Sequence, residues 1–378
     1  MRKDTACIHA ARGKDEHGAI ATPIYQSATF VHKGVEEESP YSYSRVQNPT
    51  RAALEARIAA LEGGADAIAF ASGMAAETVM MTLFESSGHI ISGDDLYGGS
   101  IRLFRHVSAP SGIRFDFVDT SDAEKVKSLI RPDTKAIYVE TPSNPVMQVT
   151  DIRAVAEIAH AAGALLIVDN TFLTPLFQRP LELGADIVIH SGTKYLGGHN
   201  DTLAGFLVVN TKELGERLRF FAKTVGACLS PFDCFLVERG VKTLAVRLER
   251  QAANAQKIAC WLRSRPQVRK VYYIGFPDHP GFAVTSKQCT GYGAMISLEL
   301  DSPETAKKIL RRVKVLQYAE SLGGVESLIT YPMLQTHADI PEAERRARGI
   351  NDRFLRISAG IENADDLLED LEQALEGK

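Results

Sequence analysis

The segment 191–199 reads S-G-T-K-Y-L-G-G-H and places a single lysine, Lys194, among hydroxyl and glycine residues. A lysine amine can form a Schiff base with an aldehyde, and the hydroxyls of Ser191 and Thr193 can donate hydrogen bonds to a phosphate. Alone, a lysine in a glycine-rich turn is usually a solvated charge. This combination suits a phosphorylated aldehyde cofactor, and the neighbouring stretches favour that interpretation.

An apolar run that ends in an acid lies upstream, L-L-I-V-D at 165–169. A buried parallel strand has this pattern, and its last residue reaches the carboxyl edge of the sheet, where ligands bind. We therefore expect Asp169 to face the pyridinium nitrogen of pyridoxal phosphate, which is a phosphorylated aldehyde.

Two further stretches could hold a phosphate. In A-I-A-F-A-S-G-M-A-A (67–76), an apolar run leads into a Ser-Gly turn and a helical pattern, so the amides of Gly73 and Met74 are expected at a helix start that attracts anions. In Y-S-Y-S-R (41–45), Tyr43 and Arg45 share one side of an extended segment. An arginine fork beside a phenol suits a phosphate.

Similar apolar runs recur along the first half of the chain, mostly separated by helical patterns such as 152–162. They lie at 67–70, 90–91, 115–118, 136–140, 165–169 and 187–190. This alternation predicts an α/β fold with a mainly parallel, doubly wound sheet and helices on both faces. Residues that follow the strands, among them Tyr97, Asn144 and Asp169, are expected to converge on one edge.

The same patterns predict how the chain is divided into domains. Residues 1–45 show no sustained period and are expected to form an extended arm. The cofactor-binding large domain is expected at 46–235, and a long helical pattern predicts a linker helix at 236–265. The smaller C-terminal domain, 266–378, has an alternating run at 292–300 followed by helical patterns, which predicts an α+β fold.

Seven motifs stand in order along most of the chain. They are S-R-V-Q-N-P-T-R (44–51), A-S-G-M-A-A (71–76), D-D-L-Y-G-G-S (94–100), E-T-P-S-N-P (140–145), V-D-N-T-F (168–172), S-G-T-K-Y-L-G-G-H (191–199) and L-R-I-S-A-G-I-E (355–362). Together they resemble the pyridoxal-phosphate enzymes of cysteine and methionine metabolism, the family of cystathionine gamma-synthase, the cystathionine lyases and methionine gamma-lyase. The resemblance implies the aspartate-aminotransferase-like fold, fold type I. Val46-Gln47 departs from the small pair usual at this place, and the sequence offers no reason for it.

The resemblance also implies roles for individual residues. Lys194 would hold the cofactor and then move protons as a base, and Tyr97 would stack on the ring and assist proton transfer. Cofactor binding would further involve Asp169, Asn144, Thr171, Ser191, Thr193, Gly73 and Met74. Tyr43 and Arg45 would reach the cofactor phosphate of the neighbouring subunit, which implies a homotetramer of active dimers.

Further residues are expected to bind the substrate. Arg356 is expected to bind the substrate α-carboxylate through two parallel hydrogen bonds, with help from Ser321. Glu320 resembles the glutamate of cystathionine gamma-synthases and gamma-lyases, and Arg102 matches a family arginine that can face a distal carboxylate. These two residues suit the second amino-acid head of cystathionine. Gly99 stands where methionine gamma-lyases typically carry a cysteine.

The resemblance therefore implies a carbon–sulfur lyase of transsulfuration, which cleaves L-cystathionine or a related thioether by gamma- or beta-elimination to a keto acid, ammonia and a thiol amino acid. Gamma-replacement, as in cystathionine gamma-synthase or O-acetylhomoserine sulfhydrylase, stays open because all three reactions use the same residues. Methionine gamma-lyase is less favoured because of Glu320 and Gly99. A non-catalytic cofactor binder is also less favoured, because it would not need Lys194 as a proton shuttle.

The bulk composition excludes other classes of protein. With 378 residues, 45% hydrophobic and 24% charged, the chain is typical of a globular protein, and its formal charge of -4 gives no reason to expect nucleic acid or membrane binding. No apolar run approaches the ~20 residues of a membrane span, and charges occupy the place of a signal-peptide core. Five scattered cysteines without C-x-x-C spacing predict free thiols, no metal site and a cytoplasmic location. The histidines at 190, 199 and 337 lack ligand spacing.

Overall fold

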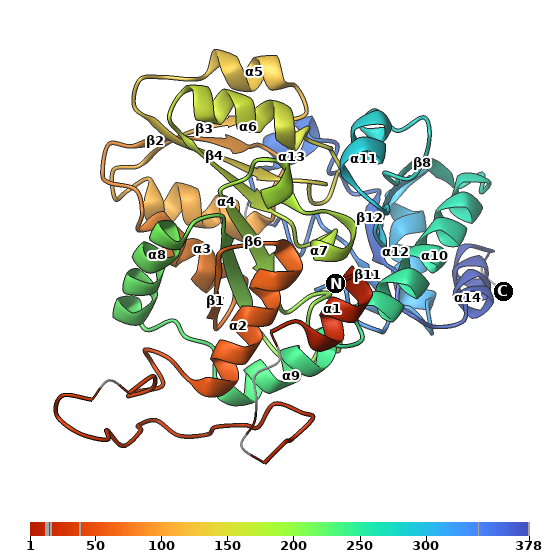
Figure 1. The fold of residues 1–378 in the computed structure, drawn as a ribbon. Helices are drawn as coiled ribbons and strands as arrows, with labels where there is room; N and C mark the ends of the chain where they lie inside the picture. The colour runs from red at the N-terminus through yellow and green to blue at the C-terminus, as the bar shows by residue number, and fades with distance from the viewer. Residues whose placement is uncertain (12–14, 16, 38, 339, 377–378) are drawn as a thin grey trace.

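Two β-sheets organise the chain in the computed structural model, which describes residues 1–11, 15, 17–37, 39–338 and 340–376. The larger sheet has seven strands in the order β1-β7-β6-β5-β4-β2-β3, and the smaller has five in the order β10-β11-β12-β9-β8 (Figure 1). The strands of the larger sheet are β1 (Asp66–Phe70), β2 (His89–Gly93), β3 (Arg114–Val118), β4 (Thr134–Glu140), β5 (Leu165–Asp169), β6 (Ile187–Ser191) and β7 (Gly205–Val209).

Helices bury both faces of this sheet. In β5, Leu166 and Val168 belong to a core shared with α2 and α6, whereas Ile167 belongs to a second core shared with α3 and α8. Successive side chains of a strand point to opposite faces, so this alternation requires apolar cover on each side. The predicted doubly wound α/β architecture is confirmed. The helices here are α2 (Pro49–Glu62), α3 (Gly73–Met81), α4 (Gly98–Leu103) with a π-helical continuation (Phe104–Ser108), α5 (Ala123–Ser128), α6 (Ile152–Ala161), α7 (Thr174–Phe177), a 3-10 turn (Pro180–Leu183) and α8 (Lys212–Val225).

One strand of the sheet was not predicted. β7 lies between β1 and β6 and runs antiparallel to both, whereas β2 to β6 pair in parallel. The run G-F-L-V-V is short and follows a turn, so periodicity alone gives it little weight. Gly205 begins the strand, and a Cβ there would lie 2.1 Å from the carbonyl oxygen of Ser72. The glycine therefore lets β7 approach the turn that follows β1.

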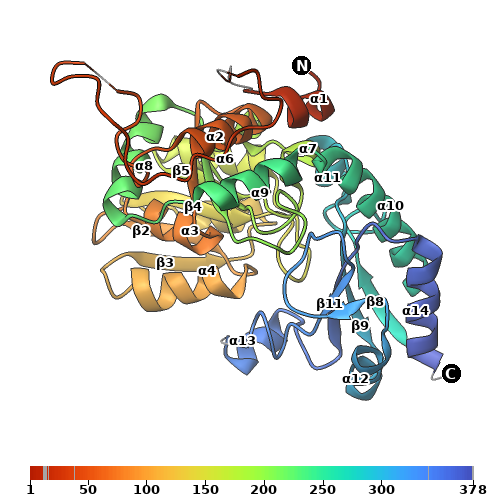
Figure 2. The ribbon, with the colours of Figure 1, turned by 90° about the horizontal axis from the view of Figure 1, so that it is seen from below.

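The smaller sheet and its helices form the C-terminal part. α10 and α12 pack on this sheet, and α14 packs against both of these helices (Figure 2). All strand pairs are antiparallel except β10 with β11, in agreement with an α+β fold. The elements are α9 (Pro231–Val241), α10 (Leu244–Arg263), β8 (Val268–Tyr272), α11 (Phe282–Gln288), β9 (Met295–Leu300), α12 (Pro303–Arg312), β10 (Gln317–Tyr318), β11 (Leu328–Thr330), α13 (Glu342–Ala347), β12 (Phe354–Ser358) and α14 (Ala364–Glu376). Across the described residues, we find no helix with the length and apolar character needed to cross a bilayer.

The sequence predicted an extended N-terminal arm, but the arm is not extended throughout. α1 (Lys3–His9) packs against α2 and α10 and buries Ala6 and Cys7. Arg57 of α2 donates to the carbonyl oxygen of Cys7 at 3.1 Å. A helix this short gains its stability from tertiary contacts, which a local pattern does not reveal. The described residues of 17–47 follow as a strand-free excursion away from the body of the protein (Figure 1).

The linker predicted as one helix over 236–265 is broken into α9 and α10. Arg247 accounts for the break, because its guanidinium donates to the carbonyl oxygens of Gly240 at 2.7 Å and Tyr195 at 2.8 Å. A Cβ on Gly240 would lie 2.1 Å from the carbonyl oxygen of Gly197. The end of α9 is thus pressed against the lysine-bearing segment. The position of the break depends on this long-range contact.

Candidate active site

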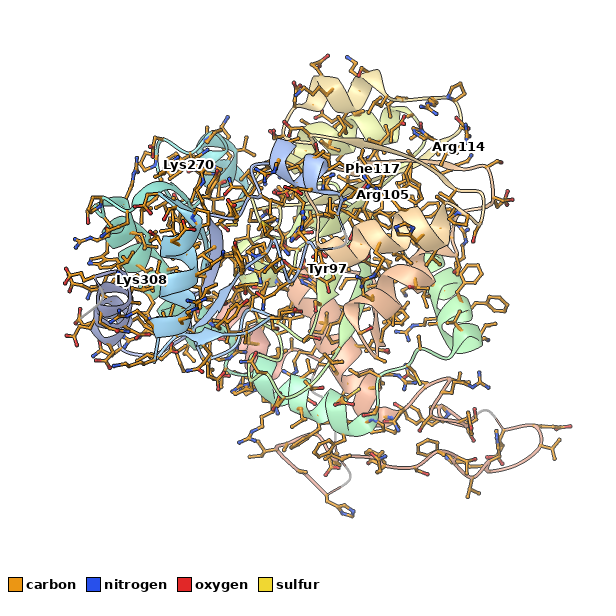
Figure 3. All side chains as sticks on the ribbon, turned by 180° about the vertical axis from the view of Figure 1, so that it is seen from behind. Tyr97, Arg105, Arg114, Phe117, Lys270 and Lys308 are labelled. Carbon is orange, nitrogen blue, oxygen red and sulfur yellow. The ribbon has the colours of Figure 1, made fainter. Side chains whose placement is uncertain are left out.

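The carboxyl ends of β1, β4, β5 and β6 open onto a cavity of about 340 Å³. Twelve of the residues predicted for the site lie on its wall: Gly73, Met74, Tyr97, Asn144, Asp169, Thr171, Ser191, Thr193, Lys194, Glu320, Ser321 and Arg356. Figure 3 shows one of them, Tyr97, near the middle of the molecule. Because these residues come from both parts of the chain, the cavity lies where the two sheets approach each other.

Lys194 follows β6 and projects its amine towards the C-terminal part. Its Nζ donates to the Oγ of Ser321 at 2.8 Å. Burial and, to a smaller extent, the nearby positive charge of Arg356 lower the pKa of Lys194 from 10.5 to about 8. An amine with such a pKa loses its proton close to neutral pH, as a nucleophile or general base must.

Asp169 is the last residue of β5 and is held by the turn that follows. Its Oδ1 accepts from the amide of Thr171 at 2.9 Å. The Oγ1 of Thr171 accepts in turn from the amide of Ser191 at 2.9 Å, which ties the ends of β5 and β6 together. Burial raises the pKa of Asp169, because a carboxylate loses hydration there. A cationic ring nitrogen facing Asp169 would offset that cost.

The start of α3 provides a seat for an anion. Ser72 caps the helix, with its Oγ accepting from the amide of Ala75 at 3.0 Å. The first amides of a helix have no partner within the helix, and the helix dipole favours a negative charge there. A Cβ on Gly73 would lie 3.4 Å from the Cα of Ser191, an ordinary contact distance, so the start of α3 lies directly beside the end of β6.

Arg356 lies on β12 and is almost completely buried, with 1% of its surface exposed. Its Nη1 donates to the Oδ1 of Asn144 at 2.7 Å and its Nη2 to the carbonyl oxygen of Ser321 at 3.1 Å, but its Nε has no hydrogen-bond partner. Burial lowers its pKa to about 10. A buried guanidinium with an unpaired N–H group fits a carboxylate ligand. Asn144 keeps its amide N–H groups free of this contact.

Three predicted residues do not line this cavity. Arg102 is exposed in the last turn of α4. Tyr43 and Arg45 lie on the arm, where the guanidinium of Arg45 sits 5.5 Å from the centre of the Tyr43 ring and donates to the carbonyl oxygen of Lys223 at 2.5 Å. The arm therefore directs this pair away from the cavity of its own chain.

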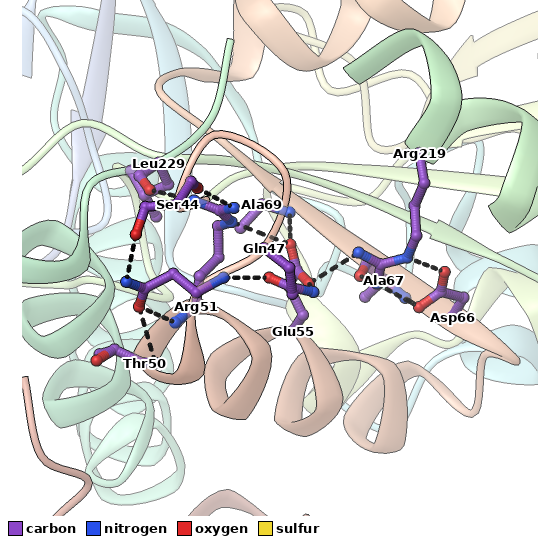
Figure 4. A network of polar contacts seen from close by, with 11 residues as sticks. Ser44, Gln47, Thr50, Arg51, Glu55, Asp66, Ala67, Ala69, Arg219 and Leu229 are labelled. Carbon is purple, nitrogen blue, oxygen red and sulfur yellow. Dashed lines mark hydrogen bonds and ion pairs between the residues drawn. The ribbon is translucent and has the colours of Figure 1, made fainter. Parts of the chain in front are cut away.

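A polar network anchors the arm to α2 (Figure 4). The amide of Gln47 donates to Glu55 at 3.1 Å, and its Oε1 accepts from the backbone amide of Asn48 at 2.9 Å. Asn48 caps α2 through the amide of Thr50 at 2.9 Å. Arg219 also donates to Glu55, at 3.0 Å. Gln47, unexplained by the sequence alone, thus fixes the base of the arm on the helix.

Two acidic residues of the cavity wall were not identified from the sequence. Glu140 ends β4 and accepts from the amide of Tyr97 at 2.8 Å, and burial raises its pKa well above the usual value. It ends an apolar run as Asp169 does, so the same signal could have identified it. Glu77 lies one turn into α3, where the sequence gives no comparable signal. Within the described ranges, no cluster of three or more His, Cys, Asp or Glu side chains could hold a metal ion.

Comparisons with known proteins identify the family of this chain. The model of the family described as "Cys/Met metabolism PLP-dependent enzyme" matches residues 4–376. Cystathionine gamma-lyase of Bacillus subtilis is 50% identical over 377 residues, 100% of both chains. Cystathionine beta-lyase of Lactococcus lactis subsp. cremoris is 48% identical over 375 residues, 99% of both chains. A crystal structure of cystathionine gamma-lyase from Lactobacillus plantarum complexed with L-serine superposes with a TM-score of 0.97 at 46% identity, covering 100% of this chain and 99% of the other. This chain therefore belongs to the family of pyridoxal-phosphate-dependent enzymes of cysteine and methionine metabolism.

Proposed function

We propose that this enzyme is a carbon–sulfur lyase that cleaves L-cystathionine, with gamma-elimination as its main reaction. The observation that carries the proposal is the position of Ser321, whose hydroxyl accepts from Lys194 and whose carbonyl oxygen accepts from Arg356. A proton-transferring amine thus lies next to a guanidinium that can hold an α-carboxylate. The name of the Bacillus subtilis relative supports gamma-elimination.

The side chains that line the cavity fit pyridoxal phosphate in their chemistry. The amine of Lys194 can join the aldehyde, the carboxylate of Asp169 can hold a proton on the ring nitrogen, and the start of α3 with Ser191 and Thr193 can receive the phosphate. When bound, the cofactor supplies an electron sink for a carbanion next to the amino group. Tyr97 would cover the ring and Asn144 would donate to its hydroxyl.

The protein residues have separate roles in binding the substrate and in moving its protons. Arg356 holds the α-carboxylate and so directs the Cα–H bond towards Lys194, whose amine removes that proton and returns protons later. Glu320, on the cavity wall, recognises the distal amino-acid head. In gamma-elimination the Cγ–S bond breaks and the sulfur leaves with a proton as cysteine, and water completes the products 2-oxobutyrate and ammonia. In beta-elimination the Cβ–S bond breaks, giving homocysteine, pyruvate and ammonia.

Product analysis with L-cystathionine tests this proposal. We expect 2-oxobutyrate and cysteine to exceed pyruvate and homocysteine, because the proposal assigns the main reaction to Cγ. The reverse ratio would establish beta-elimination, which the Lactococcus relative favours. A second incubation, with an activated homoserine ester and cysteine, detects gamma-synthase activity. If cystathionine is bound but neither keto acid nor cystathionine synthesis appears, the protein is a non-catalytic binder and the proposal is wrong.

We propose further that two copies of the chain complete each site within a homotetramer. Tyr43 and Arg45 lie together on the arm, and neither lines the cavity of its own chain. A hollow of about 770 Å³ shares Thr193, Glu320 and Ser321 with the cavity and opens outward beside residues 228–230. This hollow could receive the arm of a partner, whose arginine would add a second cation to the phosphate seat.

Mixed dimers test this arrangement. Arg45→Ala and Lys194→Ala are each expected to be inactive alone, whereas mixing the two unfolded chains and refolding them should restore about a quarter of wild-type activity, because half of the dimers then carry one intact site of two. Two Lys194→Ala preparations that carry different tags provide the matched control and should stay inactive. Absence of recovery from the first mixture would place Arg45 outside the partner's site.

We also propose a cytoplasmic location. The five cysteines at positions 7, 228, 234, 260 and 289 are free thiols, three of them in half-buried or exposed positions. Such thiols persist in a reducing compartment.

A further inference from the structure

Glu77 is a buried acid of the cavity wall that the proposed reaction does not use. Only 3% of its surface is exposed. Its Oε1 accepts from the Oγ of Ser100 at 2.9 Å, whereas its Oε2 is buried and has no hydrogen-bond partner. Among the described residues, no lysine, arginine or histidine forms an ion pair with it. A carboxylate buried in this way is costly unless it keeps a proton.

The groups around Glu77 carry negative charge or can acquire it. They are Asp169 of β5, Tyr138 and Glu140 of β4, and Tyr97 at the start of α4. Burial and, to a smaller extent, the negative charge of Asp169 raise the pKa of Glu77 to about 8, while the hydroxyls of Ser100 and Tyr138 act in the opposite direction. The cations of the cavity, Lys194 and Arg356, have their polar contacts with Ser321 and Asn144 instead.

We propose that Glu77 is a cofactor-binding residue that forms the wall of the cavity as an uncharged carboxylic acid and keeps its proton when the phosphorylated cofactor binds. The inference rests on the proposed use of this cavity for pyridoxal phosphate. Glu77 lies one turn beyond Gly73, at the positive end of α3. An ionised side chain there would offset the helix dipole and repel a phosphate dianion. The single acid charge needed behind the ring is already supplied by Asp169.

Cofactor binding and the protonation of Glu77 are then thermodynamically linked. A ligand that requires the neutral acid binds more weakly as pH rises through the pKa of the free protein. At about pH 9, a group with a pKa of about 8 is ionised in about ten molecules for each neutral one. Ionisation should therefore weaken binding about tenfold between about pH 7 and about pH 9.

The experiment measures binding of pyridoxine 5′-phosphate, which lacks the aldehyde, to the apoprotein. We expect the dissociation constant of the wild type divided by that of Glu77→Gln to rise about tenfold from about pH 7 to about pH 9. The carboxamide keeps an acceptor for Ser100 but never ionises. Titration of Lys194 affects both proteins alike and cancels in the ratio. A ratio that stays constant with pH, or falls, would overturn the proposal.

Ser100→Ala is the matched control, because it removes the hydrogen bond between α3 and α4 but leaves the acid. It should retain a pH dependence, displaced to higher pH because the hydroxyl of Ser100 no longer lowers the pKa of Glu77, whereas a purely structural Glu77 would make the two variants alike. Glu77→Met gives a second chain that cannot ionise. Calorimetry of the wild type and of Glu77→Gln in two buffers of different ionisation enthalpy should detect greater proton uptake by the wild type on binding at about pH 8.5, and equal uptake by the two proteins would also refute the proposal. Failure of every chain to bind pyridoxal 5′-phosphate would instead contradict the proposed function.

Discussion

Replacement of Lys194 by alanine is expected to reduce turnover of L-cystathionine by about ten-thousandfold or more. The change removes the group that joins the aldehyde and the base that moves the α-proton, and proton transfer alone contributes about a hundred- to ten-thousandfold. It also leaves the hydroxyl of Ser321 without its 2.8 Å partner. Release of keto acid, measured at saturating substrate with added cofactor, gives the loss in turnover.

Lys194→Arg separates chemistry from packing in this experiment. Arginine keeps a cation of similar reach that can still donate to Ser321, but its pKa lies too high for it to lose a proton near neutral pH. It should therefore be as inactive as the alanine variant. A small added amine such as ethylamine should partly restore the alanine variant and leave the arginine variant unchanged. Activity of Lys194→Arg within tenfold of wild type would exclude the lysine as the catalytic base.

Replacement of Arg356 by methionine is expected to lower kcat/KM for cystathionine about a thousandfold, or about 4 kcal/mol of transition-state stabilisation. The guanidinium is buried and lacks a carboxylate partner within the described chain, so the substrate would supply the missing charge. Two charge-assisted hydrogen bonds to a carboxylate account for a loss of this size. Steady-state kinetics provide the measurement.

Binding of the cofactor distinguishes a substrate role for Arg356 from a structural one. Affinity for pyridoxal phosphate should change little in Arg356→Met, because the phosphate seat and Asp169 lie on other elements. Arg356→Lys keeps the charge but not the planar fork, and it should recover only part of the activity. If Arg356→Met loses cofactor affinity as much as activity, the residue supports the cavity and does not select the carboxylate.

Sequence and structure agree best for elements that a local sequence pattern identifies. β5 was predicted with its bounds because an apolar run and a terminal acid are local features. β7 was missed because its place in the sheet depends on pairing with β1, which lies far away in the chain. The break between α9 and α10 was missed for the same reason, since Arg247 reaches back to Tyr195 across 52 residues.

The candidate site shows the same difference between features that depend on local patterns and features that depend on long-range contacts. Motif spacing selected Lys194, Asp169 and Arg356, but not Glu77, because a glutamate inside a helical pattern resembles a solvated one until the helix is packed. Only the structure showed that Gln47 anchors the arm and that Arg45 points away from its own cavity.

Strand–helix alternation and motif order are local features, so they were enough to identify the fold class, the family and the residues able to do chemistry. The tertiary structure decided which of those residues share a cavity, and which protonation states their burial favours. Burial, close approach and charge coupling arise between residues more than a hundred positions apart, such as Lys194 and Ser321. No local pattern encodes contacts of that range.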